Sequence, residues 1–254
     1  AHVQLDYFPS SVRKALQKFK GNAGRGMCFP FAIAKTYSHV DLISSVKGIW
    51  RSANSIESRP KIPVGISGFV GATSSSQAAV QLRFKEHVGS SAGRIRIYGR
   101  NNGGTYKLSI TSGAFQQSVS LRNSILKDSG YVDVFFTSLK DTVDLLLQQE
   151  AQGVQDTFYL YGLSFEKNQG GVLYHNLGVG GADYSALNAQ TWFENQIQIA
   201  NPDLVILDWG TNDIIYYNKI DTALESTILK TIARIRKAVP DAVILLPSVQ
   251  DMNY

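Results

Sequence analysis

The sequence has a single cysteine, Cys28, among its 254 residues, and this excludes an intrachain disulfide. Cys28 stands in the apolar stretch Met27-Cys-Phe-Pro-Phe31, a setting that favours a core position over a nucleophilic thiol. The sequence also lacks any run of about 18 apolar residues. We therefore expect neither a disulfide scaffold nor a membrane-spanning segment.

A strong charge of one sign is absent as well. The net charge is +5, and the 25 Lys and Arg residues are dispersed rather than gathered into a basic run or an aromatic and basic stripe. We expect a solvated basic surface and no nucleic-acid partner. No group of His, Cys and carboxylate residues has metal-ligand spacing, so we predict no metal and no cofactor. A hydrophobic content of 44% is enough for one or two folded domains with a sizeable core.

The N-terminal part predicts one helix followed by irregular structure. Residues 9–19 begin with a proline and two serines and place Val12, Leu16 and Phe19 on one helical face. The glycine-rich stretch 21–26 has neither a preceding strand nor a following Lys-Ser/Thr, which favours a turn over a phosphate-binding loop. Residues 29–50 have little periodicity and predict a long loop with short elements.

Between residues 62 and 167 apolar and polar side chains alternate with a period of two. Seven short strands without intervening helices indicate an antiparallel sandwich, because one face of each sheet is then buried. The predicted strands cover residues 79–84, 94–98, 106–110, 118–121, 131–135, 142–146 and 157–161. Tyr98, Tyr106, Tyr131 and Tyr161 offer rings for glycan binding, although a core role suits most of them better.

After residue 168 the pattern returns to alternating helices and strands. Helices are predicted at 184–199 and 220–239, and buried strands at 205–209 and 242–246. The sandwich is thus expected as an insertion, residues 62–167, into a discontinuous α/β domain made of residues 1–61 and 168–254. Parallel strands joined by helices are the expected core of that domain.

Two strand-to-loop junctions carry the polar groups of a candidate site. The apolar run Val205-Ile-Leu-Asp-Trp-Gly-Thr-Asn-Asp213 ends on an asparagine, and Tyr174-His-Asn-Leu-Gly-Val-Gly-Gly-Ala182 places a glycine turn before a helix. Loops at the carboxyl ends of parallel strands line the ligand crevice in α/β folds. A glycine N–H and an asparagine amide there can hydrogen-bond one developing negative oxygen, as an oxyanion hole requires.

This pair of motifs resembles the second and third conserved blocks of SGNH hydrolases, the GDSL-type esterases. The resemblance implies a flavodoxin-like, three-layer α/β fold with a parallel sheet. It assigns the oxyanion hole to Gly181 and Asn212, and it places the nucleophilic serine at the position of Ala1, with His2 after it. Ala1 is then a cloning remnant, a substitution or a natural difference. The family's Asp-x-x-His block is not found after the strand at 242–246, so the general base has no assignment.

A sandwich between the first and second blocks is similar to the branch of the family that acts on O-acetylated cell-envelope polysaccharides, peptidoglycan included. The resemblance implies a serine esterase located outside the cytoplasm, with an insert that is similar to a carbohydrate-binding module. It also implies that the chain is truncated at both ends and inactive as given. A non-catalytic polysaccharide-binding protein and an O-acetyltransferase of the same fold remain alternatives.

Other residues near these motifs have two interpretations each. Asn212 is an oxyanion donor or a turn-capping residue, and Asp213 binds substrate, orders the site or caps a helix. His2 and His175 are substitutes for the missing base or hydrogen-bonded structural residues, and His2 is also a candidate substrate-binding residue. His39 and His87 are expected at the surface. Asp208 lies within an apolar run and needs a partner if it is buried.

Overall fold

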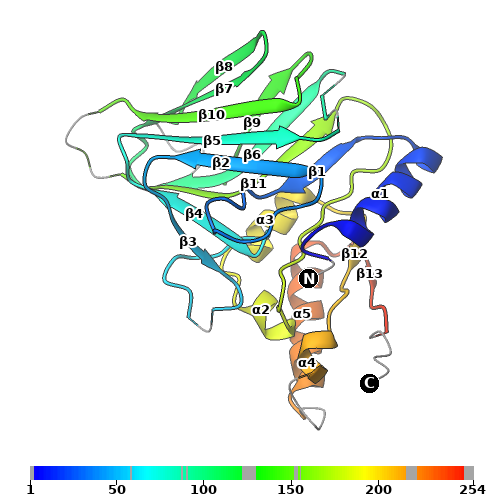
Figure 1. Ribbon diagram of the computed structural model, residues 1–254. Helices are drawn as coiled ribbons and strands as arrows, with labels where there is room; N and C mark the ends of the chain where they lie inside the picture. Colours follow the sequence, from blue (N-terminus) through cyan, green and yellow to red (C-terminus); the bar gives the residue numbers. More distant parts are fainter. Residues whose placement is uncertain are drawn as a thin grey trace.

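The computed structural model describes residues 3–57, 59–86, 88–89, 91–121, 130–151, 154, 156–215 and 222–248. Two antiparallel sheets are stacked on one side of the molecule, and four of the five helices in these residues lie beneath them (Figure 1). The fifth, α1 (Tyr7–Lys20), lies beside the edge of the sandwich, next to β1. The others are α2 (Tyr184–Asn188), α3 (Phe193–Ala200), α4 (Thr211–Ile215) and α5 (Leu224–Ala238).

The first sheet has six strands in the order β3-β4-β11-β6-β9, with β1 also paired to β11. Its strands are β1 (Gly24–Cys28), β3 (Arg51–Asn54), β4 (Phe69–Thr73), β6 (Gly93–Asn101), β9 (Tyr131–Phe136) and β11 (Phe158–Lys167). The second sheet has five strands in the order β2-β5-β10-β7-β8. They are β2 (Leu42–Lys47), β5 (Gln77–Phe84), β7 (Tyr106–Ser112), β8 (Phe115–Ser120) and β10 (Thr142–Gln149).

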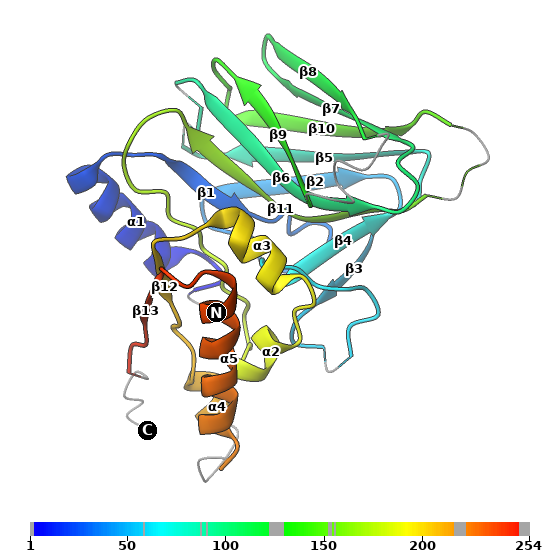
Figure 2. The same ribbon diagram turned by 180° about the vertical axis from the view of Figure 1, so that it is seen from behind.

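The two sheets differ in how many faces they bury. In β5 buried and exposed residues alternate, so that sheet has one face toward solvent. In β11, eight of the ten residues from Phe158 to Lys167 are buried and the other two are half-buried. Both faces of this strand are covered, because α3 packs on the side away from the second sheet (Figure 2). The first sheet and the helices enclose a second apolar core. Tyr98 and Tyr161 belong to this core and are 0% and 1% exposed. The first sheet is therefore the central layer.

All seven predicted strands are confirmed, as β5 to β11. Tyr98, Tyr106 and Tyr161 are core residues, while Tyr131 is half-buried with the Arg96 guanidinium 4.3 Å from its ring centroid. The helix predicted at 184–199 is broken into α2 and α3, and the one at 220–239 is α5.

The predicted flavodoxin-like, three-layer α/β fold is wrong. The sheets are mostly antiparallel, and parallel strand pairing in the described part is confined to the short sheet of β12 (Leu204–Ile206) and β13 (Val243–Leu245), apart from one isolated bridge. The cause is the strand that follows α1. β1 pairs antiparallel with β11, from Gly24 opposite Glu166 to Cys28 opposite Leu163, and so extends the sandwich. β2 and β3 join the sandwich too.

The expectation that residues 205–209 and 242–246 are buried strands also fails. Leu204 and Ile206 are 49% and 41% exposed, and Val243 and Leu245 are 61% and 49% exposed. Leu207, just after β12, is buried. Asp208 is exposed and so needs no buried partner. Among the described residues, no helix has the length and apolar character needed to cross a membrane.

The helix predicted at 9–19 is confirmed as α1, but its apolar face is not the buried one. Leu16 and Phe19 are 41% and 78% exposed, whereas Arg13 is only 5% exposed. A charged side chain can be buried in this way only if its charge is paired. The packing of α1 is therefore set by ion pairs, which are described with the site below.

We expect Gly26 to be intolerant of a side chain. Its φ is +78°, and a Cβ there would lie 2.2 Å from the carbonyl oxygen of Tyr174. Gly26→Ala should lower the free energy of unfolding by about 2 kcal/mol or more, since both the strained φ and the backbone contact act. Urea denaturation measures this. Gly170→Ala, where a Cβ meets no atom within 4 Å, is the control and should change stability by no more than about 1 kcal/mol. Equal losses in both variants would contradict the close packing of β1 on Tyr174.

Candidate functional site

The structure brings the two predicted blocks into contact. Asn212, in the first turn of α4, donates from Nδ2 to the carbonyl oxygen of Ala182 at 2.7 Å. Ala182 directly follows Gly181, which is exposed and has a φ of +80° that favours glycine. Because an asparagine amide has two N–H groups, the bond to Ala182 leaves the second one for another acceptor. Gly181 and Asn212 therefore lie at one place on the surface.

Asp213 ties the same two blocks together. Its carboxylate accepts a hydrogen bond from the backbone N–H of Tyr184, the first residue of α2, at 3.2 Å. Burial raises the pKa of this carboxyl, while the hydrogen bond from Tyr184 lowers it, and the net shift is upward. The ring of Tyr184 meets Trp209 edge to face at 5.6 Å. Asp213 thus orders the glycine turn, and its role in substrate binding remains a prediction.

The N-terminal segment lies against the glycine turn. The carbonyl oxygen of Val3 accepts from Nδ2 of Asn176 at 2.7 Å, and Oε1 of Gln4 accepts from the N–H of Gly180 at 2.6 Å. A Cβ on Gly178 would lie 2.5 Å from the side chain of Val3. Ala1 and His2 lie outside the described residues. The chain nevertheless enters the described part beside the turn that carries Gly181.

A pocket of about 290 Å³ lies where these segments meet. Gln4 and Leu5 line it from the N-terminal side, Gly180 and Gly181 from the turn, and residues 36–37 from the loop before β2. Gln4 also holds this loop, since its Nε2 donates to the carbonyl oxygen of Tyr37 at 3.1 Å. The backbone N–H of Gly181 has no acceptor among the described residues and borders the pocket. The arrangement offers a small cavity with hydrogen-bond donors at its edge.

Buried charges fix the N-terminal segment in this position. The carboxylate of Asp6 is fully buried and accepts two bonds from Arg13, at 3.2 and 2.7 Å. Arg25 of β1 approaches the same carboxylate at 3.3 Å and binds Asp41 at 2.8 Å. Asn176 donates to Asp6 at 2.9 Å, so the block that leads to the glycine turn takes part directly. Together these contacts join α1, β1, the loop before β2 and the glycine block.

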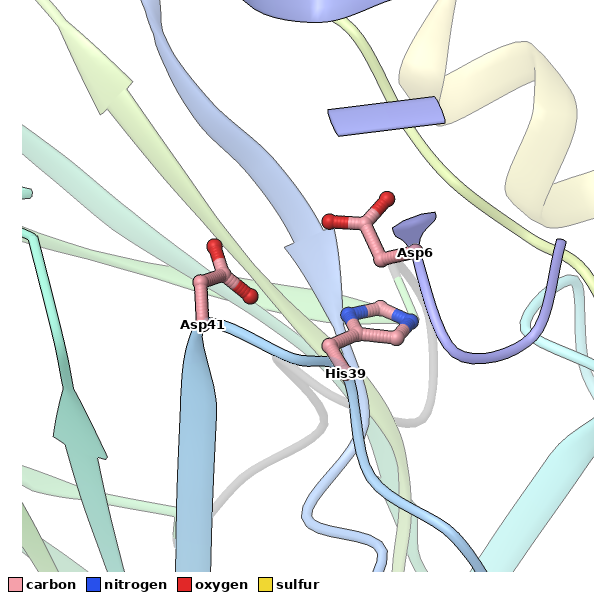
Figure 3. A group of neighbouring side chains, drawn as sticks. All are labelled: Asp6, His39 and Asp41. Atoms are coloured by element: carbon pink, nitrogen blue, oxygen red, sulfur yellow. The ribbon is translucent and has the colours of Figure 1, made fainter. Parts of the chain in front are cut away.

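His39 lies inside this cluster, between Asp6 and Asp41 (Figure 3). The expectation that His39 is at the surface is wrong, since it is 3% exposed. Its Nδ1 lies 2.8 Å from Nη2 of Arg25, and because a guanidinium only donates, Nδ1 must be the acceptor. Burial, together with the positive charge of Arg25, lowers the pKa of His39 to about 3. Burial alone would raise the pKa of Asp41, but the charge and hydrogen bonds of Arg25 hold it below its usual range.

The donor set of Asp6, His39 and Asp41 has the composition of a metal site, and the three ligand atoms lie within 4.8 Å of one another. However, Arg13 and Arg25 already bind the two carboxylates. A cation would have to displace a guanidinium, so we assign the group as an ion-pair cluster. The absence of a metal from the function remains a prediction.

His175 and Cys28 are not placed for catalysis. Nδ1 of His175 accepts from the backbone N–H of Met27 at 3.1 Å, and burial lowers the pKa of the ring to about 4. The lone pair of Nδ1 is thus occupied by a hydrogen bond from the backbone of β1, which agrees with a structural role for this histidine. Cys28 is buried, as predicted, and burial raises the pKa of its thiol to about 12. His87 lies outside the described residues.

Several residues of the site were not found from the sequence. The ion-pair residues Asp6, Arg13 and Arg25 belong to no recognisable sequence motif, because most of their partners are distant in the sequence. Gln4 and the loop at residues 36–37 were also missed, since nothing local indicates that they line a pocket. Asn176 belongs to the motif at residues 174–182, before the glycine turn, and its place in that motif is the sequence feature that could have marked it as a site residue.

The sequence matches the model of the GDSL-like lipase/acylhydrolase family over residues 109–253. This match covers more than half of the chain, so the chain belongs to the GDSL-like lipase/acylhydrolase family, which confirms the resemblance to SGNH hydrolases. The protein is thus placed in a class of acyl hydrolases. A search of curated proteins gives no match.

Solved structures with weak similarity include a family two carbohydrate esterase from Cellvibrio japonicus, at 12% identity over 83% of this chain and 81% of that chain, with a TM-score of 0.27. TmCBM61 in complex with β-1,4-galactotriose is 13% identical over 49% and 88% of the two chains, with a TM-score of 0.30. The lectin domain of lectinolysin, complexed with Lewis B antigen, is 15% identical over 39% and 72%, with a TM-score of 0.28. At these TM-scores the likenesses carry no argument about function.

The ion-pair cluster predicts a contrast between two neighbouring residues of α1. Arg13→Met should lower the free energy of unfolding by about 3 kcal/mol or more, because it leaves the buried charge of Asp6 without its bidentate partner. Lys14→Met is the matched control. Lys14 and its partner Glu86 are 58% and 60% exposed, so its loss should cost about 0–1 kcal/mol. Chemical denaturation measures both, and equal effects would contradict the role given to the cluster.

Stability should fall as the pH is lowered from 7 toward 4. The folded-state pKa values of His39 and His175 are about 3 and 4, below the ordinary 6.5, so in this range the unfolded chain binds protons that the folded chain does not. The stabilising contribution is complete above pH 6.5 and is lost as the pH falls toward the folded pKa values. His39→Gln should reduce this pH dependence, since glutamine keeps an acceptor for Arg25 but does not titrate. Urea unfolding at several pH values tests this, and an unchanged pH dependence in the variant would rule it out.

Proposed function

We propose that the protein is a serine esterase that removes O-acetyl groups from a cell-envelope polysaccharide. The observation that supports this most is that three separate segments meet at the glycine turn: Gln4 and Gly181 line one small pocket, and Asn212 donates to the carbonyl oxygen of Ala182, next to Gly181. Those are the segments that the family resemblance assigns to the nucleophile, the oxyanion glycine and the oxyanion asparagine. The family itself is one of acyl hydrolases.

The size of the pocket supports a short acyl group. At about 290 Å³ it lies at the lower end of the volumes that bind small molecules. An acetyl group fits such a space, whereas a long fatty acyl chain would extend beyond it. The exposed glycine turn at the rim leaves room for a sugar that carries the ester. A polysaccharide substrate of the cell envelope also implies a location outside the cytoplasm.

In the proposed reaction, the oxygen of a serine at position 1 bonds to the ester carbonyl carbon while its proton passes to a general base. The carbonyl electron pair moves to oxygen, and the N–H of Gly181 and the second N–H of Asn212 donate to this oxyanion. Collapse of the intermediate breaks the bond to the sugar oxygen, which takes up the proton. Water then attacks the acetyl-enzyme in the same way and releases acetate.

A non-catalytic polysaccharide-binding protein is the second candidate. The residue at the nucleophile position is Ala1, whose methyl group cannot attack an ester. Asn212 then serves only to hold the glycine turn through Ala182. The two candidates differ in what a serine at position 1 does, since it creates an esterase in the first case and changes nothing in the second.

The test uses the Ala1→Ser variant of the protein and p-nitrophenyl acetate as substrate. We expect hydrolysis that is insensitive to chelators and faster than that of p-nitrophenyl octanoate. Asn212→Ala should lower kcat by about 10²–10³-fold with little change in KM, because the oxyanion exists only near the transition state. Gln198→Ala, which removes an exposed amide from α3, is the control and should retain full activity.

Two results would count against the proposal. An Asn212→Ala variant as fast as its parent would remove the oxyanion role. No hydrolysis by the folded protein with Ser at position 1 would favour the binding protein instead. Thermal unfolding of each variant separates a loss of chemistry from a loss of fold, since Asn212→Ala also removes the bond to Ala182.

A further inference from the structure

A second cavity, of about 450 Å³, lies away from the glycine turn on the central sheet. It lies where β6 ends and β11 begins. Trp192, the residue that precedes α3, lines it as well. Its walls carry three aromatic residues, Tyr159, Tyr161 and Trp192, and three polar ones, Arg100, Asn101 and Asn102. The proposed reaction uses none of these six side chains.

The cavity combines ring surfaces with hydrogen-bonding groups. Tyr159 is half-buried, and its hydroxyl accepts from Nδ2 of Asn102 at 3.4 Å. The guanidinium of Arg100 lies 3.5 Å from the ring centroid of Trp192, within the range of a cation–π contact. A pyranose has an apolar C–H face and a rim of hydroxyls. Aromatic rings pack against the first, and amide and guanidinium groups bind the second.

The polar rim of the cavity is held rigidly. The buried carboxylate of Asp156 accepts from the backbone N–H groups of Asn102, Gly103 and Thr105 at 3.1, 2.6 and 2.9 Å. It also accepts from the hydroxyl of Thr105 at 3.0 Å. The loop after β6 is therefore fixed before any ligand arrives. A preformed rim lowers the entropy lost on binding, which matters for a ligand as flexible as a glycan.

One connection reaches both the cavity and the glycine turn. Residues 55–68 join β3 to β4, and a Cβ on Gly181 would lie 3.9 Å from Ile56 in this connection. Further along this connection, Pro63 lines the cavity. The carbonyl oxygen of Val64 accepts a hydrogen bond from the backbone N–H of Trp192 at 3.1 Å. The same connection therefore borders both the cavity and the glycine turn.

We infer that the cavity lined by Arg100, Asn102, Tyr159 and Trp192 binds a pyranose unit of the polysaccharide whose ester groups are cleaved at the glycine turn. This inference rests on the proposed function for the identity of the polymer. Binding of one sugar unit in the cavity keeps the polymer on the protein while acetyl groups are presented to Gly181 and Asn212.

The experiment titrates the full chain with chitotetraose and with soluble O-acetylated peptidoglycan fragments, using calorimetry. We expect one-to-one binding of at least one of them. Tyr159→Ala should raise its Kd at least tenfold, through loss of the ring, and Asn102→Ala should do so through loss of the amide. Asn102 is exposed, so its variant is expected to fold even if Tyr159→Ala does not. Gln116→Ala, which removes an exposed amide from β8 in the other sheet, should change Kd by less than twofold.

Activity separates this inference from the proposed function. In an Ala1→Ser background, Asn102→Ala should leave hydrolysis of p-nitrophenyl acetate unchanged and slow the deacetylation of the O-acetylated peptidoglycan fragments at limiting substrate. Binding of glycan without any esterase activity would support the cavity and reject the esterase. Esterase activity with no glycan affinity, or with affinity equal in the wild type and both variants, would overturn the inference. Binding of adenosine monophosphate in place of both glycans would overturn it too.

Discussion

The fold around the candidate site depends on one fully buried carboxylate, that of Asp6. A charge removed from water in this way is tolerated only if other groups neutralise it and satisfy its oxygens. Arg13 comes from α1, Arg25 from β1 and Asn176 from the block before the glycine turn. Three segments therefore bind the same carboxylate. As a result, the N-terminal segment is held against the turn that carries Gly181.

This constraint explains why the N-terminal part joins the sandwich. With Arg25 held by Asp6 and Asp41, β1 lies along β11, and Gly26 lets the backbone of Tyr174 approach it closely. The central sheet is then covered on one face by the second sheet and on the other by helices, as Figure 2 shows. The candidate site lies at the seam between the sandwich and the glycine turn, so its geometry depends on both.

The sequence allowed β5 to β11 to be predicted, whereas β1, β2 and β3 were not. β5, β7 and β10 have one face in solvent, so their side chains alternate and the period of two is visible. β1 is buried on both faces and contains two glycines, and it shows no such period. The contact of Asn212 with the residue after Gly181 followed from two local motifs, whereas the burial of His39 depends on carboxylates and a guanidinium that only the folded chain brings together.

Asn212 shows how the structural and chemical demands on one side chain are combined. One of its amide N–H groups is used by Ala182, and this bond fixes both the orientation of the amide and the position of the neighbouring Gly181. The second N–H is thereby oriented without a substrate being present. Donors that are already in place need not reorganise as negative charge develops, and this is the main source of transition-state stabilisation in acyl transfer. The hydrogen bond from Asn212 to Ala182 thus has two roles: it holds the glycine turn, and it preorganises the proposed oxyanion hole.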